Sequence, residues 1–133
     1  MSETTSDMPP EFAGFFDHAR TGKLAFPHCR ACGTFHWYPM PLCPHCRSRD
    51  VGWQTIAGAG EIYAFTRVMH AFDKARAGDL PYYVAIVTFP DAPGVRFVTN
   101  IEGHADTVQI GKPVRPVFEV GSNGLPIVKF GAA

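Results

Sequence analysis

The residues of this chain best suited to chemistry are its four cysteines, which fall into two matched pairs. Cys29 and Cys32 form the first Cys-x-x-Cys pair, and Cys43 and Cys46 form the second. Each pair can turn tightly enough to direct two sulfurs at one point, and two such turns on a short hairpin enclose a tetrahedral site. The spacing therefore predicts a metal site with Cys29, Cys32, Cys43 and Cys46 as its ligands.

Zinc is the metal that we expect in this site. A tetrathiolate with all four ligands from the protein is the usual form of a closed structural zinc site, which leaves no position for water or substrate. We therefore expect one structural Zn²⁺ per chain. Iron suits the same sulfur cage, so the residues alone do not decide between the two metals.

Disulfide bonding and redox chemistry are the competing interpretations of the cysteines. The segment MSETTSDMPP has no basic start and no apolar centre, so it does not have the pattern of a secretory signal. We therefore expect a soluble, cytoplasmic protein whose thiols stay reduced. A thioredoxin-like motif would use one Cys-x-x-Cys pair and leave the second unexplained.

The residues after each pair indicate how the two turns close. Gly33 directly follows Cys32 and suits a left-handed backbone position. Arg47 follows Cys46 and suits that position less well, which predicts a different turn for the second pair.

Histidines and arginines surround the two pairs. We expect the histidines to face solvent rather than bind metal, because four sulfurs are already available. They are His28, His36 and His45. A zinc tetrathiolate is negatively charged, so the arginines are expected to neutralise it. They are Arg30, Arg47 and Arg49.

A short helix is expected before the cysteines, over residues 11–22, after a loose tail at residues 1–10. Its apolar side chains share one face, and Gly22 ends it. They are Phe12, Phe15, Phe16 and Ala19. This face has to be covered either by the chain's own ribbon and barrel or by a partner chain, and the sequence leaves both open. Residues 23–55 are expected to form the zinc ribbon.

Residues 56–133 read as five short strands, with an excursion between the third and the fourth. The strand segments are 57–71, 80–90, 95–102, 112–120 and 125–130. This trace matches a five-stranded Greek-key barrel of the OB type, so the fold class is mainly β. Pro113 and Pro116 predict that the fourth strand lies at an edge or carries a bulge.

Catalytic motifs of the common kinds are absent from the sequence. It has no Gly-x-Ser-x-Gly, no phosphate-binding loop and no glycine-rich dinucleotide turn, and the cysteines are committed to the metal. His70 with Asp73 is a weak acid–base candidate. The longest apolar runs, such as residues 82–87, are too short to span a bilayer. A non-catalytic role without a membrane is therefore expected.

A single-stranded nucleic-acid binder is the alternative function. OB barrels bind such strands with stacked aromatics and cations, for which Tyr63, Phe65 and Arg67 are available. The net charge of the chain is zero, however, and residues 51–133 hold as many acids as bases. Binding to phosphates without an excess of cations is weak at physiological salt, so nucleic acid is an unlikely partner.

The order and spacing of several segments resemble a known family. The segments are TGKL before the first pair, YPMPLCPHC around the second, GAGEIYAFT, PYYVAIVTFPDAPGVRFVTNI and IGKPVRPVFE. The chain resembles the rubredoxin-like zinc-ribbon and OB-fold proteins, known as domain of unknown function number thirty-five, that accompany thiolase-like enzymes. The resemblance covers nearly the whole chain from Phe12. His28 and Met40 depart from the more polar or basic residues expected at those positions.

This resemblance implies a non-catalytic accessory subunit in a hetero-oligomer. It implies a thiolase, ketosynthase-like or aldolase partner, and acyl-CoA as a ligand of the barrel. The loop between the first two barrel strands is the candidate for contacts to CoA or to the partner, with cations for phosphates and aromatics for the adenine or acyl chain. The candidate residues are His70, Phe72, Lys74, Arg76 and Tyr82.

Overall fold

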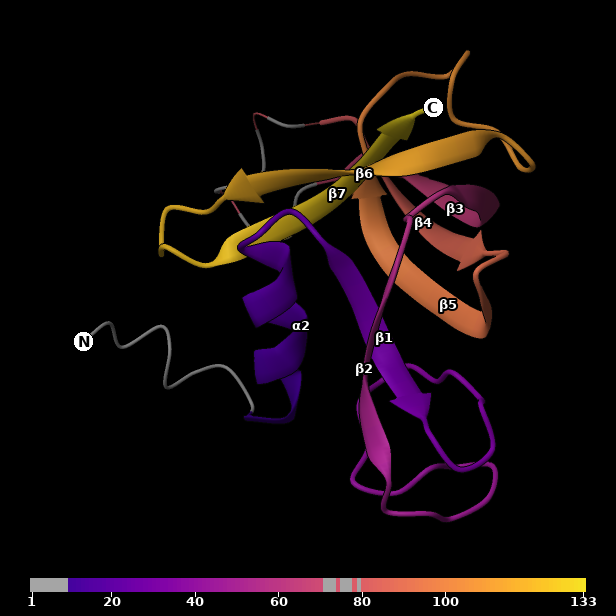
Figure 1. Ribbon diagram of the computed structural model, residues 1–133. Coiled ribbons are helices and arrows are strands. Elements are labelled where there is room, and N and C mark those ends of the chain that lie inside the picture. Colours follow the sequence, from indigo (N-terminus) through magenta and orange to yellow (C-terminus); the bar gives the residue numbers. More distant parts are fainter. Residues whose placement is uncertain (1–9, 71–73, 75–77, 79) are drawn as a thin grey trace.

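The computed structural model describes residues 10–70, 74, 78 and 80–133 (Figure 1). A single turn of 3-10 helix, η1 (Pro10–Phe12), leads directly into the short helix α2 (Ala13–Ala19), and seven strands follow. The strands are β1 (Leu24–Cys29), β2 (Val51–Ile56), β3 (Gly60–Val68), β4 (Tyr82–Phe89), β5 (Ala92–Ile101), β6 (Pro113–Val120) and β7 (Pro126–Ala132). The predicted tail lies outside the described residues, apart from Pro10.

Strands β1 and β2 form a two-stranded antiparallel ribbon, with Leu24 opposite Ile56 and Cys29 opposite Val51. The other five strands close into a barrel in the order β3-β4-β5-β7-β6. The β5–β7 pair is parallel and all other pairs are antiparallel, which is the Greek-key arrangement of an OB fold. The predicted fold class is confirmed: a short helix, a zinc-ribbon region and a five-stranded OB-type barrel.

Strand β6 closes the barrel through a short contact with β3. Only Val114 and Pro113 pair with β3, opposite Gly60 and Glu61, whereas the whole of β6 pairs with β7. The remaining β3-facing side of β6 therefore behaves as an edge, where a residue without an N–H group such as Pro116 is tolerated.

The interior of the barrel follows the alternation of β4. Tyr83, Ala85, Val87 and Phe89 are buried, whereas the residues between them are half-buried and point outwards. This period of two is what a strand with one face on a core requires.

The helix, the ribbon and the barrel share one aromatic cluster. The Phe15 ring of α2 lies 5.1 Å from Trp37, which belongs to the ribbon, and 5.7 Å from Phe97 in β5 (distances between ring centroids). Phe26 of β1 is fully buried between Trp37 and Phe97, at 5.4 and 5.6 Å. The apolar face of the helix is thus covered by its own chain, which resolves the choice that the sequence left open.

None of the helices in the described part of the chain is long and apolar enough to cross a lipid bilayer.

Candidate metal centre

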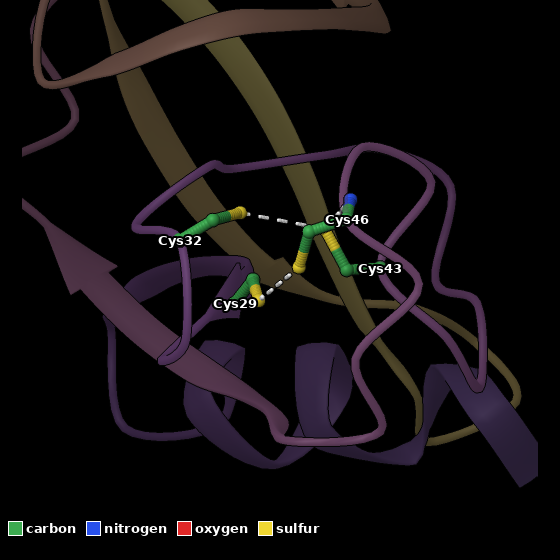
Figure 2. Close-up of side chains that lie close together, drawn as sticks. All are labelled: Cys29, Cys32, Cys43 and Cys46. Carbon is green, nitrogen blue, oxygen red and sulfur yellow. Dashed lines mark hydrogen bonds between the residues drawn. The ribbon is translucent and has the colours of Figure 1, made fainter.

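The four cysteine sulfurs converge on one position at the end of the ribbon (Figure 2). Cys29 is the last residue of β1, and the other three lie on the loops between β1 and β2. All four Sγ atoms lie within 4.8 Å of one another. Cys29 and Cys43 are buried, whereas Cys32 and Cys46 are exposed, so the cluster lies at the surface.

The distances between the sulfurs suit a tetrahedral metal ion. Cys29 Sγ lies 3.6 Å from Cys46 Sγ, and Cys32 Sγ lies 3.7 Å from Cys43 Sγ. Four Zn–S bonds of about 2.3 Å in a tetrahedron place the sulfurs about 3.8 Å apart. A disulfide would require about 2.0 Å. The donor set and its spacing therefore fit zinc.

Both Cys-x-x-Cys pairs close with the same turn. The Gly33 N–H donates to the Cys29 carbonyl at 2.8 Å with φ of 77°, and the Arg47 N–H donates to the Cys43 carbonyl at 2.9 Å with φ of 67°. The prediction of a different second turn was wrong. Arg47 adopts the left-handed conformation despite its Cβ, because the turn has to bring Cys43 and Cys46 to the same point.

Hydrogen bonds to backbone and side-chain groups surround two of the cysteine sulfurs, Cys43 and Cys32. The backbone N–H groups of His45 and Cys46 donate to Cys43 Sγ at 3.3 and 3.4 Å. Thr34, whose hydroxyl oxygen lies 3.2 Å from Cys32 Sγ, lowers the pKa of Cys32 to about 6. A lowered pKa favours the thiolate, which is the form of cysteine that binds a metal.

The pKa of Cys46 is shifted in the opposite direction, because it lies among the other three sulfurs. The backbone hydrogen bond from Ser48 lowers the pKa of Cys46, but desolvation by the surrounding atoms and the hydrogen bonds to the other three cysteines outweigh it and raise the pKa to about 12. Four sulfurs this close do not all ionise unless a cation compensates their charge. A divalent ion supplies that compensation.

The basic and imidazole groups around the cluster differ in their roles. Arg30 forms an exposed ion pair with Asp50 at 2.8 Å, so its charge is partly compensated by that carboxylate. His45 is exposed, and the half-buried His28 packs on Phe35 with ring centroids 4.7 Å apart.

His36 was wrongly predicted to face solvent. Only 7% of its surface is exposed, and burial lowers its pKa. Within the described residues neither ring nitrogen has a hydrogen-bond partner. The backbone explains the burial, because the His36 N–H donates to the Pro27 carbonyl at 3.1 Å and so ties this segment against β1.

The second candidate site lies on the loop between β3 and β4. His70 and Lys74 are exposed there, and Tyr82 is half-buried at the start of β4. Phe72 and Arg76 lie outside the described residues, as does Asp73. The grouping of these five side chains into a site for CoA or a partner therefore stays a prediction.

One contact between distant residues was not predicted from the sequence. The guanidinium of Arg96 in β5 lies over the ring of Tyr63 in β3, 4.5 Å from its centroid. Strand β4 separates these residues in the sheet, so only the three-stranded register could have revealed the pair.

A ribbon that gathers four cysteines, joined to a closed OB barrel, defines the class of zinc-ribbon and OB-fold proteins. Residues 16–52 match the ChsH2 rubredoxin-like zinc ribbon domain, and residues 53–119 match the ChsH2 C-terminal OB-fold domain. The chain belongs to this ChsH2 family of paired zinc-ribbon and OB-fold domains, and the predicted resemblance and zinc ribbon are confirmed.

Two curated relatives are similar to this chain. A probable enoyl-CoA hydratase alpha subunit of Thermomonospora curvata is 39% identical over 105 residues, which cover 77% of this chain and 31% of that protein. The chain thus spans about a third of the length of that relative. A DUF35 domain-containing scaffold protein of Methanocaldococcus jannaschii is 31% identical over 104 residues, which cover 73% of this chain and 71% of that protein.

Two solved structures share the fold. A chain of the Ltp2-ChsH2(DUF35) aldolase superposes with a TM-score of 0.82 at 31% identity, covering 94% of this chain and 96% of that one. A DUF35-family protein of unknown function from Sulfolobus solfataricus superposes with a TM-score of 0.65 at 19% identity, covering 98% of this chain and 91% of that one. The second comparison supports the fold alone.

Proposed function

We propose that this protein is a non-catalytic accessory subunit that binds a thiolase-like or hydratase-type enzyme and supports its reaction on acyl-CoA. The observation that carries the proposal is the nearly full-length match to a chain of the Ltp2-ChsH2(DUF35) aldolase, whose name joins two proteins. The relatives named as a hydratase subunit and as a scaffold protein point in the same direction. A hetero-oligomer in the cytoplasm is the expected form of the protein.

A structural metal favours the role of an accessory subunit over that of an enzyme. We propose that Cys29, Cys32, Cys43 and Cys46 are the four ligands of one zinc ion per chain. With four sulfurs around the ion, no coordination position is left for water or substrate. The same ligation removes every cysteine of the chain from use as a nucleophile.

Acyl-CoA is the ligand that we propose for the loop between β3 and β4. Lys74 projects from this loop as an exposed cation, and Arg76 follows two residues later in the sequence. Cations at this spacing suit the phosphates of the nucleotide part of CoA. Phe72, His70 and Tyr82 provide flat rings for the adenine or the acyl chain.

Co-expression with a thiolase-like or hydratase-type enzyme of the same organism tests the association. We expect a stable complex by size-exclusion chromatography, in which the enzyme has a higher activity on an acyl-CoA substrate than it has alone. Activity of this chain without any partner would contradict a non-catalytic role.

Titration calorimetry of the complex with an acyl-CoA tests the loop. The double variant Lys74→Ala/Arg76→Ala should weaken binding about tenfold or more, because charge-assisted contacts to phosphate are lost. Lys112→Ala/Arg115→Ala removes the same charge from the start of β6 and its approach, and should bind like the wild type. Equal affinity for both double variants would exclude the loop as the phosphate site.

A further inference from the structure

The outer face of β3, β4 and β5 carries an uncharged strip across all three strands. Ile86 in β4 pairs with Ala64 in β3 on one side and with Val98 in β5 on the other. Val84 pairs in the same way with Thr66 and Asn100. These side chains point away from the barrel core, because the alternate residues of β4 are the buried ones. Two successive cross-strand rows thus hold no charge.

This strip forms a shallow groove of about 310 Å³ in the barrel surface. Its walls are almost wholly apolar, with Ala64, Val84, Ile86 and Val98 among the residues that line it. Val98 is 52% exposed. An uncharged groove of this kind lets a partner bury an apolar side chain without desolvating a charge.

Arg96 and Tyr63 border the groove at the next cross-strand row. A β-bulge between Ile62 and Ala64 makes Tyr63 an additional residue in β3, and this residue is 47% exposed. Bulges commonly re-orient a side chain at functional edges. The Tyr63 ring thereby lies against Arg96, 4.5 Å from the guanidinium.

Arg96 is held in place, and it forms no ion pair with Glu61, which lies in the same cross-strand row on the other side of Thr88. Among the described residues no carboxylate forms an ion pair with it, whereas the stacking on Tyr63 fixes its position. A fixed guanidinium beside an apolar groove suits a partner that presents an apolar side chain next to a carboxylate. Tyrosine and arginine are also the residue types most enriched among energetically dominant interface positions.

The opposite face of the same barrel has a different character. On β6 and β7, Lys129 and Glu119 form an ion pair at 3.1 Å, and Arg115 is exposed on the same hairpin. Mixed, paired charges are typical of surfaces that stay in water. Val120 is exposed on this hairpin as well, so the difference between the two faces lies in their charge: the β6–β7 hairpin carries charged side chains, whereas the two rows of the β3–β5 strip carry none.

We propose that this outer β3–β5 face, with the groove at Ile86 and Val98 and the Tyr63–Arg96 pair at its border, is the docking surface for the enzyme subunit. The proposal rests on the proposed function, because it takes that enzyme as the occupant. The enzyme inserts an apolar side chain between Val98 and Ala64 over Ile86 and pairs a carboxylate with Arg96.

Binding of the purified enzyme to charge-bearing variants tests the surface. Val98→Asp places a carboxylate in the groove and Arg96→Glu reverses the charge at its border, while both side chains point to solvent and leave the core intact. Each variant should raise the dissociation constant for the enzyme at least about tenfold, as measured by titration calorimetry. Val120→Asp is the matched control, because Val120 is 78% exposed on the β6–β7 hairpin, and it should bind like the wild type. Circular dichroism confirms that each variant is folded.

The outcomes separate this inference from the proposed function. If the wild type binds the enzyme and Val98→Asp and Arg96→Glu bind equally well, the docking surface is wrong and the proposed function stands. Loss of binding only in Val120→Asp would place the interface on the opposite hairpin. If the wild type alone is a dimer that Val98→Asp converts to a monomer, a second copy covers the face. If the wild type binds no enzyme, the proposed function fails and the docking surface with it.

Discussion

The ring of Phe15 in α2 lies 5.7 Å from the ring of Phe97 in β5, measured between ring centroids, although 82 positions separate them in the chain (97 − 15). Both side chains are buried, and both also contact Trp37 of the ribbon. The N-terminal helix is therefore part of the core that joins the ribbon to the barrel. The three segments are expected to unfold together rather than as separate modules.

Phe15→Ala tests this shared core. The substitution removes a buried ring from the cluster and should lower the free energy of unfolding by about 3–5 kcal/mol. Urea denaturation followed by tryptophan fluorescence measures the change, and release of zinc to a chromogenic chelator reports the ribbon in the same titration. Val120→Ala, at a mostly exposed position, should change stability by less than about 0.5 kcal/mol. Separate transitions for fluorescence and zinc release in the wild type would show that the modules are independent.

Local patterns were sufficient to predict much of this fold. The spacing of the cysteines predicted the cluster because each pair needs only one tight turn to bring its sulfurs together. Residues 80–90 were predicted as a strand because they form a short run of mostly β-branched and aromatic residues, apolar on both faces, and the structure shows that one of these faces lines the core. In both cases the information lies within a few residues of the feature.

The features that escaped prediction depend on residues far apart in the sequence. The burial of His36 follows from pairing of its backbone with Pro27, and the Tyr63–Arg96 contact follows from a bulge and from two strand registers. The covering of the helix by Phe97 is of the same kind. Periodicity showed that the helix had an apolar face but contained no information on which surface meets it.

Cys43→Ser tests the metal centre as a source of stability. Cys43 is buried, and its sulfur is close to two backbone N–H groups, so the loss of this ligand disrupts both the ion and the turn. The variant should contain less than one zinc per chain by elemental analysis and should aggregate or unfold at room temperature, because metal binding is coupled to folding. His45→Ala changes an exposed neighbour and should keep its zinc. A folded, metal-free Cys43→Ser protein would refute a structural metal.

Arg47→Gly should stabilise the protein, although it removes a side chain. Arg47 has φ of 67°, where a residue with a Cβ is disfavoured by about 1–2 kcal/mol and glycine is not. We expect a gain of up to about 1 kcal/mol over Arg47→Ala, which removes the same charge but keeps the Cβ. Thermal unfolding of the zinc-loaded proteins measures the difference. Gly33→Ala, at φ of 77° in the first turn, should lose stability by a similar amount. If Arg47→Gly and Arg47→Ala had equal stability, the left-handed turn would not be under strain.

His36 should make the stability of the protein depend on pH in the weakly acidic range. Burial lowers the pKa of His36 in the folded protein below its ordinary value of 6.5, which the unfolded chain retains. Between these two pKa values the unfolded state binds more protons, so the free energy of unfolding falls as the pH decreases through this window. Well above pH 6.5 the imidazole is neutral in both states, and the effect vanishes.

His36→Leu isolates this contribution, because leucine fills the buried site without polar atoms. At pH 7.5 the variant should be as stable as the wild type or up to about 2 kcal/mol more stable, since the imidazole nitrogens have no hydrogen-bond partner among the described residues. From pH 7 to 5.5 its stability should fall less steeply than that of the wild type. Urea denaturation at each pH measures both slopes, and the zinc content is determined in parallel because acid also protonates the cysteines. His28→Leu, at a half-buried position on β1, serves as the control for a general loss of histidine. Parallel slopes for the wild type and His36→Leu would mean that His36 is not the group that titrates.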